Sequence, residues 1–179
     1  AYLGHDDLWF PWHLSELVDC IETSNSDFVY SLGAALGPDG VIGTFALPRR
    51  PSFLGEKLSP INWLHRKSLT EVVGSWSPRA KVGVDREFLQ RVLTANAKLA
   101  FRRKLTGLIF QSGEWHMYSL RRDFPQTKCV NAMRQDAAGF RDELLLEIAT
   151  LVSRRGFLPY ERRSPLHRGF AWLLARAIS

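Results

Sequence analysis

The sequence has few of the features that mark specialised classes of protein. Only two of its 179 residues are cysteines, Cys20 and Cys129, and their spacing matches neither a disulfide framework nor a set of metal ligands. It holds no apolar run long enough to span a membrane, no signal-peptide pattern, no internal repeat and no low-complexity segment. These absences exclude a disulfide-stabilised scaffold and a repeat array. They favour a reducing compartment, with Cys20 as a buried free thiol.

The composition is that of a globular protein. Hydrophobic residues make up 45% of the chain and charged residues 23%, and the length suits one domain with a substantial core. The formal net charge is +6. Such a surface favours polyanionic partners, which include nucleic acid, phosphorylated small molecules and anionic lipid, and charge alone does not choose among them.

Hydrophobic patterning predicts alternating strands and helices over the first two-thirds of the chain and mainly helices over the last third. This alternation predicts an α/β fold. Residues 1–4 read as the end of a strand. Further strands are predicted over residues 27–36, 41–47, 61–65 and 97–110, and helices over residues 11–24, 68–74, 85–96, 136–156 and 164–178.

Two of these helices carry more detailed predictions. Ser68 and Glu71 have the spacing of a capping box at the start of helix 68–74. In helix 11–24, the 3.6-residue period predicts one buried face made of Leu14, Leu17, Val18 and Ile21.

Two adjacent carboxylates, Asp6 and Asp7, follow the predicted strand end at residues 1–4. Carboxylate oxygens are the ligands that Mg²⁺ and Mn²⁺ prefer, and such an ion is commonly shared with substrate phosphates. Ligands of open α/β sheets lie beyond the carboxyl ends of the strands. The pair therefore predicts a divalent metal site. The alternative is that the two carboxylates cap the helix that follows or favour its dipole.

Three stretches, each a weak motif alone, stand in an order and at a spacing that together are more specific. They are "GHDDLW" at residues 4–9, "LHRKSLTEVVGSW" at residues 64–76 and "VDREFLQRVLTANAKLAF" at residues 84–101. This succession resembles the second half of family 2 glycosyltransferases of the GT-A fold, over about residues 1–112. The resemblance implies a GT-A-like acceptor- and metal-binding half over residues 1–112 and a helical extension over residues 113–179. Family members carry a nucleotide-binding βαβ half before this point, so the resemblance implies part of a longer transferase.

The resemblance implies transfer of a sugar, with inversion, from a nucleotide-sugar donor to a hydroxyl of a glycan or lipid-linked acceptor. Asp6 matches the last acidic position of the family's DxD-type motif and is the first metal ligand, with Asp7 beside it. Gly4 stands where the family has the first acidic residue of that motif. His5 and Arg66 are implied on the donor side, although a surface ion pair is an alternative for Arg66.

Asp85 matches the family's acidic position before a helix, and the resemblance implies that it is the base that deprotonates the acceptor hydroxyl. Glu87 is the second candidate. Asp85 could instead be the N-cap of the helix. His65 and Trp76 are implied on the acceptor side, because an aromatic face packs against a sugar ring, and core packing is the alternative for Trp76.

Other functions remain open at this stage. Basic and aromatic residues interleave at residues 100–105 and 117–124, as in a nucleic-acid-binding module, but no nucleic-acid motif is present and we expect no such partner. A metal-dependent phosphohydrolase would need His13 or His116 beside the acidic pair, and an inactive half-domain is a third possibility. Helix 164–178 is amphipathic, so peripheral contact of a cytoplasmic protein with a membrane surface is a further expectation.

Overall fold

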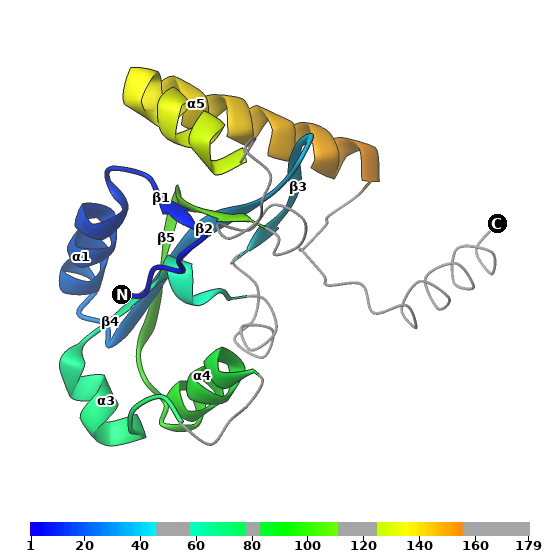
Figure 1. Ribbon diagram of the computed structural model, residues 1–179. Coiled ribbons are helices and arrows are strands. Elements are labelled where there is room, and N and C mark those ends of the chain that lie inside the picture. The colour runs from blue at the N-terminus through cyan, green and yellow to red at the C-terminus, as the bar shows by residue number, and fades with distance from the viewer. Residues whose placement is uncertain (46–57, 78–82, 111–124, 156–179) are drawn as a thin grey trace, which may run out of the picture.

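The computed structural model describes residues 1–45, 58–77, 83–110 and 125–155 (Figure 1). Its centre is a mixed five-stranded sheet, in which β1, β5, β2 and β3 lie in that order and β4 also pairs with β2. Strands β2 and β5 are parallel, and the other pairs are antiparallel. The strands are β1 (Leu8–Trp9), β2 (Phe28–Gly37), β3 (Gly40–Phe45), β4 (Trp63–His65) and β5 (Leu99–Phe110).

Helices cover both faces of this sheet. Alternate residues of β2 point to opposite faces, so Val29 packs on α1 while Phe28 and Tyr30 pack on the side of α3 and α4. The mixed α/β class predicted from the sequence is thereby confirmed. The helices are α1 (His13–Thr23), α3 (Lys67–Val73), α4 (Val84–Thr94) and α5 (Pro125–Arg155), and a short 3₁₀ helix, η2 (Pro60–Asn62), precedes β4.

Helix α5 consists of two helical pieces that meet at Asp136, whose backbone is extended (φ −152°, ψ 91°). The Asp136 carboxylate accepts hydrogen bonds from the amides of Ala138 and Gly139, at 3.1 and 2.9 Å, and so caps the second piece. The sequence predicts a helix that starts at residue 136, and this is confirmed for the second piece. The first piece was not predicted.

The helix α5 and the sheet share one apolar cluster. Cys129 and Leu144 of α5 are buried together with Phe10, Leu36 and Leu108, which come from the sheet and the segment beside it. In Figure 1, α5 lies along the end of the sheet formed by β3 and β1. The apolar core thus continues past residue 112 into the segment predicted as an extension.

Several local predictions are wrong. Residues 1–4 form no strand, and the sheet begins after the acidic pair, at Leu8. Helix α3 starts at Lys67 without a side-chain cap, so the capping box of Ser68 does not form. Helix α1 buries a face rotated from the predicted one, because it packs on the sheet through His13, which bonds to Thr106 of β5, and through the residues that cluster with Val29 of β2. The buried set is His13, Leu17, Cys20 and Ile21, and Leu14 and Val18 are exposed.

Other predictions agree with the structure or lie outside it. Residues 27–36 and 41–47 were predicted as strands, and β2 and β3 confirm both over the described residues. Cys20 is a buried free thiol, as expected. The predicted helix 164–178 and His116 lie outside the described residues.

Candidate functional site

Pairing of β1 with β5 places the acidic pair at the carboxyl end of the parallel strands. Leu8 pairs with Leu108 in an antiparallel register, so the residue before it, Asp7, falls opposite Ile109 near the end of β5. The Phe110 amide donates a hydrogen bond to Asp7 Oδ1 at 3.2 Å. Phe110 in turn pairs with Leu36 near the end of β2. This edge of the sheet is where ligands bind in open α/β folds.

Burial changes the pKa of one member of the pair, Asp7. Loss of solvation raises the pKa of Asp7 to about 6, the Phe110 amide opposes that rise, and the neighbouring Asp6 adds to it. Asp6 is only 16% exposed, and its carboxylate lies 4.0 Å from Nδ1 of the exposed His5. The structure therefore brings three of the predicted site residues together. A bound cation would offset the cost of holding two carboxylates in a partly buried place.

The pair offers carboxylate oxygens, which are the kind of ligand that Mg²⁺ and Mn²⁺ prefer. Within residues 1–45, 58–77, 83–110 and 125–155, no group of three or more His, Cys, Asp or Glu side chains is placed to hold a metal ion. Mg²⁺ is usually held by one or two carboxylates, with substrate phosphates and waters supplying the other ligands. Asp6 and Asp7 supply that number of carboxylates.

The Asp7 side chain limits the space beside Gly4. A Cβ atom at position 4 would lie 2.6 Å from Asp7 Oδ2 and would push that carboxylate away. The glycine at position 4 therefore leaves room for the Asp7 carboxylate in its observed place.

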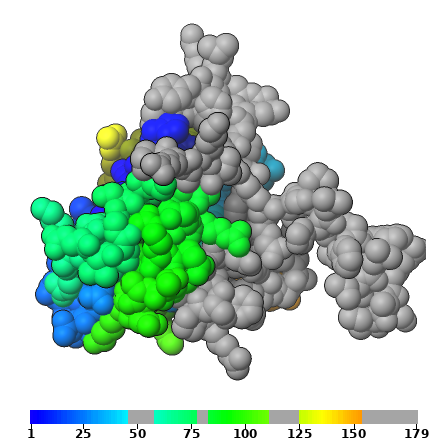
Figure 2. All heavy atoms as spheres, turned by 90° about the horizontal axis from the view of Figure 1, so that it is seen from below, coloured from blue at the N-terminus to red at the C-terminus, as the bar shows by residue number. Residues whose placement is uncertain are grey.

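A second group of predicted residues meets in an aromatic cluster between the N-terminal segment and α4. Trp76 stacks on Phe88 of α4 with ring centroids 5.1 Å apart, and Tyr2 meets the Trp76 ring edge-on at 4.9 Å. His65 lies 5.6 Å from both Tyr2 and Phe88. Residues from β4, α4 and the chain start thus share one site. Figure 2 shows the surfaces of α3 and α4 side by side on the face below the sheet.

Hydrogen bonds fix the tautomer of His65. Its Nδ1 lies 2.9 Å from the carbonyl oxygen of Arg66, which only accepts, so Nδ1 carries the proton. Nε2 is then the acceptor for the Tyr2 hydroxyl at 2.7 Å. Burial lowers the pKa of His65, so the ring is neutral at pH 7.

The Trp76 ring packs as a core residue. One parallel contact is made with Phe88 and another with Trp63, at 6.1 Å. Its indole N–H is buried and has no hydrogen-bond partner in the described part of the chain. These contacts support the core-packing alternative for Trp76.

Asp85 lies in the first turn of α4 and is not its N-cap, because Gly83 holds that position with φ +68°. Phe88 follows it by three residues, and such residues lie on one side of a helix. Asp85 therefore points to the side of α4 that carries the aromatic cluster. Among the described residues, no hydrogen bond or ion pair holds its carboxylate, whereas Glu87 is bound by Arg91 at 2.7 Å.

Arg66 lies apart from the acidic pair. Its guanidinium donates to Glu22 at 2.9 Å and to the carbonyl oxygens of Ser26 and Ile21, at 2.9 and 3.3 Å. These three acceptors belong to the end of α1 and the turn after it. Arg66 thus joins β4 to α1, which matches the ion-pair alternative.

His13 is also separate from the acidic pair. It is 1% exposed, stacks on Trp9 at 4.3 Å and bonds through Nδ1 to the Thr106 hydroxyl at 2.8 Å. Burial lowers its pKa to about 4. The phosphohydrolase alternative needs His13 or His116 beside the carboxylates; His13 instead joins α1 to β5, and His116 lies outside the described residues.

Sequence reasoning missed Tyr2 and Arg91. Tyr2 was assigned to a strand end, yet its hydroxyl and ring make the contacts to His65 and Trp76. Arg91 donates to the Val73 and Ser75 carbonyls and so holds the loop that carries Trp76 against α4. The spacing of Glu87 and Arg91, four residues apart on a helix, was a readable signal for the second of these.

Comparison with known proteins adds no assignment, since no protein-family model matches the chain and no match is found among curated proteins. In the described residues, no helix has both the length and the apolar character that crossing a membrane requires.

Proposed function

We propose that this chain is the metal- and acceptor-binding part of a family 2 glycosyltransferase with a GT-A-type fold, acting on a nucleotide-sugar donor. One observation carries the proposal. The segment from Tyr2 to Asp7 runs from the aromatic cluster of His65 and Trp76 to the end of the parallel strands at Phe110. Five residues span at most about 18 Å, so the carboxylates and the cluster are close enough to serve one donor–acceptor pair.

On this proposal, Asp6 and Asp7 hold Mg²⁺ or Mn²⁺, and His5 lies beside them on the donor side. When bound, the ion stabilises the negative charge that develops on the leaving diphosphate. The amide of Phe110 orients Asp7, and Gly4 leaves room for its carboxylate. Arg66 is already held by three acceptors, so we assign it to the α1 anchor and not to the diphosphate.

Asp85 accepts the proton of the attacking acceptor hydroxyl. Its carboxylate has no partner among the described residues and lies on the side of α4 that faces the cluster. Glu87 is less suited to this role, because its hydrogen bond with Arg91 lowers its pKa and occupies both oxygens. On the acceptor side, the proposal uses the ring surfaces of His65 and Trp76, because both ring nitrogens of His65 already bond to Arg66 and Tyr2.

The metal site is tested by titrating the chain with Mn²⁺ in the presence of a nucleoside diphosphate. We expect Asp6→Asn and Asp7→Asn each to weaken Mn²⁺ binding at least about ten-fold, since each removes an anionic ligand. Gly4→Ala is expected to weaken it less, by displacing the Asp7 carboxylate. Leu3→Ala, on the exposed neighbour, is the matched control. If all four variants bind Mn²⁺ equally well, Asp6 and Asp7 do not form the metal site.

The catalytic assignment is tested by release of nucleoside diphosphate from a panel of nucleotide sugars with glycan and lipid-linked acceptors. We expect Asp85→Asn to lower turnover by about 10²–10⁴, the usual contribution of a general base. Asp142→Asn, an exposed acid on α5, should have no effect. If Glu87→Gln abolishes turnover and Asp85→Asn does not, Glu87 is the base.

A further inference from the structure

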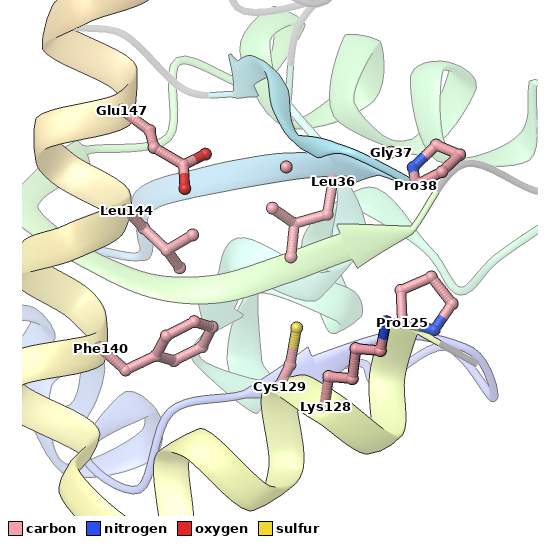
Figure 3. A pocket seen from close by; sticks show the side chains of 10 residues that line it. Leu36, Gly37, Pro38, Pro125, Lys128, Cys129, Phe140, Leu144 and Glu147 are labelled. Carbon is pink, nitrogen blue, oxygen red and sulfur yellow. The ribbon is translucent and has the colours of Figure 1, made fainter. Parts of the chain in front are cut away.

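Helix α5 and the β2–β3 hairpin enclose a pocket of about 320 Å³ (Figure 3). None of the residues assigned above to metal, donor or acceptor lines it. Its apolar wall is formed by Leu36, Pro38, Cys129, Phe140 and Leu144. Small-molecule sites range from about 300 to 1,000 Å³, so this pocket suits a short acyl chain or a single ring system.

The pocket is built by the break in α5. The change of direction at Asp136 lets both helical pieces line the same space, with Cys129 on the first piece and Leu144 on the second. Glu147 of the second piece accepts a hydrogen bond from the Val41 amide at 2.9 Å, which fastens this piece to the hairpin. Gly40 has φ +116°, and a Cβ there would lie 2.7 Å from Glu147 Oε2, so the hairpin turn is fitted to that contact.

The two ends of the pocket differ in charge. Figure 3 shows Lys128 at the end near Pro125 and Pro38, and Glu147 at the opposite end, with apolar side chains between them. In the described part of the chain, the Lys128 ammonium forms no hydrogen bond or ion pair. The Glu147 carboxylate already accepts from Val41, and Asp39 and Glu143 line the adjoining groove beside it. An anionic group is therefore attracted to the Lys128 end and repelled from the other.

Lys128 is also turned away from the acidic pair. Gln126, two residues earlier, donates its side-chain amide to the Asp6 carbonyl at 3.3 Å. Residues two apart lie on different sides of a helix, so Lys128 does not share the side that faces Asp6. Its charge is free to serve a ligand in the pocket.

We propose that this pocket binds a free amphipathic acid, with a short apolar chain or ring between the two halves of α5 and its carboxylate or phosphate paired with Lys128. The apolar wall supplies binding energy through burial, and the ammonium fixes the direction in which the ligand enters. This site is independent of sugar transfer and of any metal ion.

The test is binding of decanoate to the full chain below its micelle concentration, followed by calorimetry. Decanol, which has the same chain without the charge, is the matched probe. We expect decanoate to bind at least about ten-fold more tightly than decanol, which is the value of one hydrogen bond to a charged group. Lys128→Gln should remove that difference, and Lys98→Gln, at an exposed lysine outside the pocket, should keep it.

A second readout does not depend on charge. The Cys129 sulfur faces the pocket, and burial raises the pKa of its thiol to about 11, so alkylation by a maleimide in the Cys20→Ala chain is first measured without ligand at mildly alkaline pH. Bound decanoate should slow this alkylation. The same melting temperature for both lysine variants verifies that they fold. Decanoate binding that survives Lys128→Gln, or alkylation that decanoate leaves unchanged, would overturn the proposal. The proposal would also be overturned if the chain sediments with anionic vesicles but shows no saturable binding of free decanoate.

Discussion

At the residue scale, several side chains make contacts that differ from those the sequence predicts. Tyr2 was assigned to a strand end, and it donates to His65 and packs on Trp76. Gly4 departs from the resembling family, and its lack of a side chain makes room for Asp7. Arg66 was placed on the donor side, and it holds the end of α1. For Tyr2 and Arg66 the deciding contact comes from a residue far away in the sequence, whereas for Gly4 it comes from Asp7, three residues on.

The buried ring of His13 carries a testable effect on stability. Its pKa is lowered to about 4 by burial, from an ordinary value of 6.5. Between these values the unfolded chain binds the proton and the folded chain does not, so the free energy of unfolding falls as the pH is lowered from 6.5 to 4. The full effect of such a shift is about 3 kcal/mol.

We expect His13→Gln to lose this part of the pH dependence, because glutamine can still bond to Thr106 and does not titrate. Urea unfolding at pH 7, 5.5 and 4.5 gives the comparison. Above pH 6.5 the two chains should differ by a constant amount. Identical slopes for the two chains between pH 6.5 and 4 would contradict the buried neutral ring.

At the element scale, the break in α5 has a local cause. Asp136 leaves the helical conformation, and its carboxylate caps the amides of Ala138 and Gly139. The cap makes the second piece a helix in its own right. It also sets the direction that brings Phe140 and Leu144 over the hairpin.

Removal of the cap should destabilise the protein measurably. We expect Asp136→Ala to lower the free energy of unfolding by about 1 kcal/mol, the usual loss for an N-cap. Asp142→Ala is the control, because Asp142 is exposed and pairs only with the adjacent Arg141. Urea midpoints of the two variants distinguish the roles. An equal, small loss in both would show that Asp136 is not a working cap.

At the scale of the whole molecule, α5 and the sheet share buried side chains and should unfold together. Leu144 of α5 is 3% exposed and lies in the cluster that contains Phe10, Leu36 and Leu108. A helical extension that folded by itself would have no such shared core. The described part of α5 is thus integral to the sheet it covers.

Shortening the Leu144 side chain tests whether α5 and the sheet unfold together. We expect Leu144→Ala to cost about 3 kcal/mol and to lower the stability of the sheet as much as that of the helix, within one transition. Leu146→Ala, two residues on and 70% exposed, should cost under about 0.5 kcal/mol. Hydrogen exchange of β2 and α5 amides provides the readout. Exchange that accelerates in α5 alone would contradict a shared core.

The elements were readable from the sequence where the pattern was local. Strand β2 is an unbroken apolar run, and α4 has a clear amphipathic period with Phe88, Leu89 and Val92 inside. The buried face of α1 was less readable, because its contact with β5 through the polar residue His13 leaves Leu14 and Val18 exposed. The first piece of α5 is half polar, and its helix is supported by packing on the sheet, so its sequence gave no clear period.

The sequence by itself determined the α/β class, most of the strands, the buried state of Cys20 and the existence of an acidic pair, since each depends on residues adjacent in the chain. Only the tertiary structure decided which side chains meet. The β1–β5 register brought Asp7 to Phe110, the N-terminal segment brought Tyr2 to His65, and the break in α5 formed the pocket with Lys128. Those contacts join residues remote in sequence, and they form because folding buries apolar surface that local patterns cannot pair in advance.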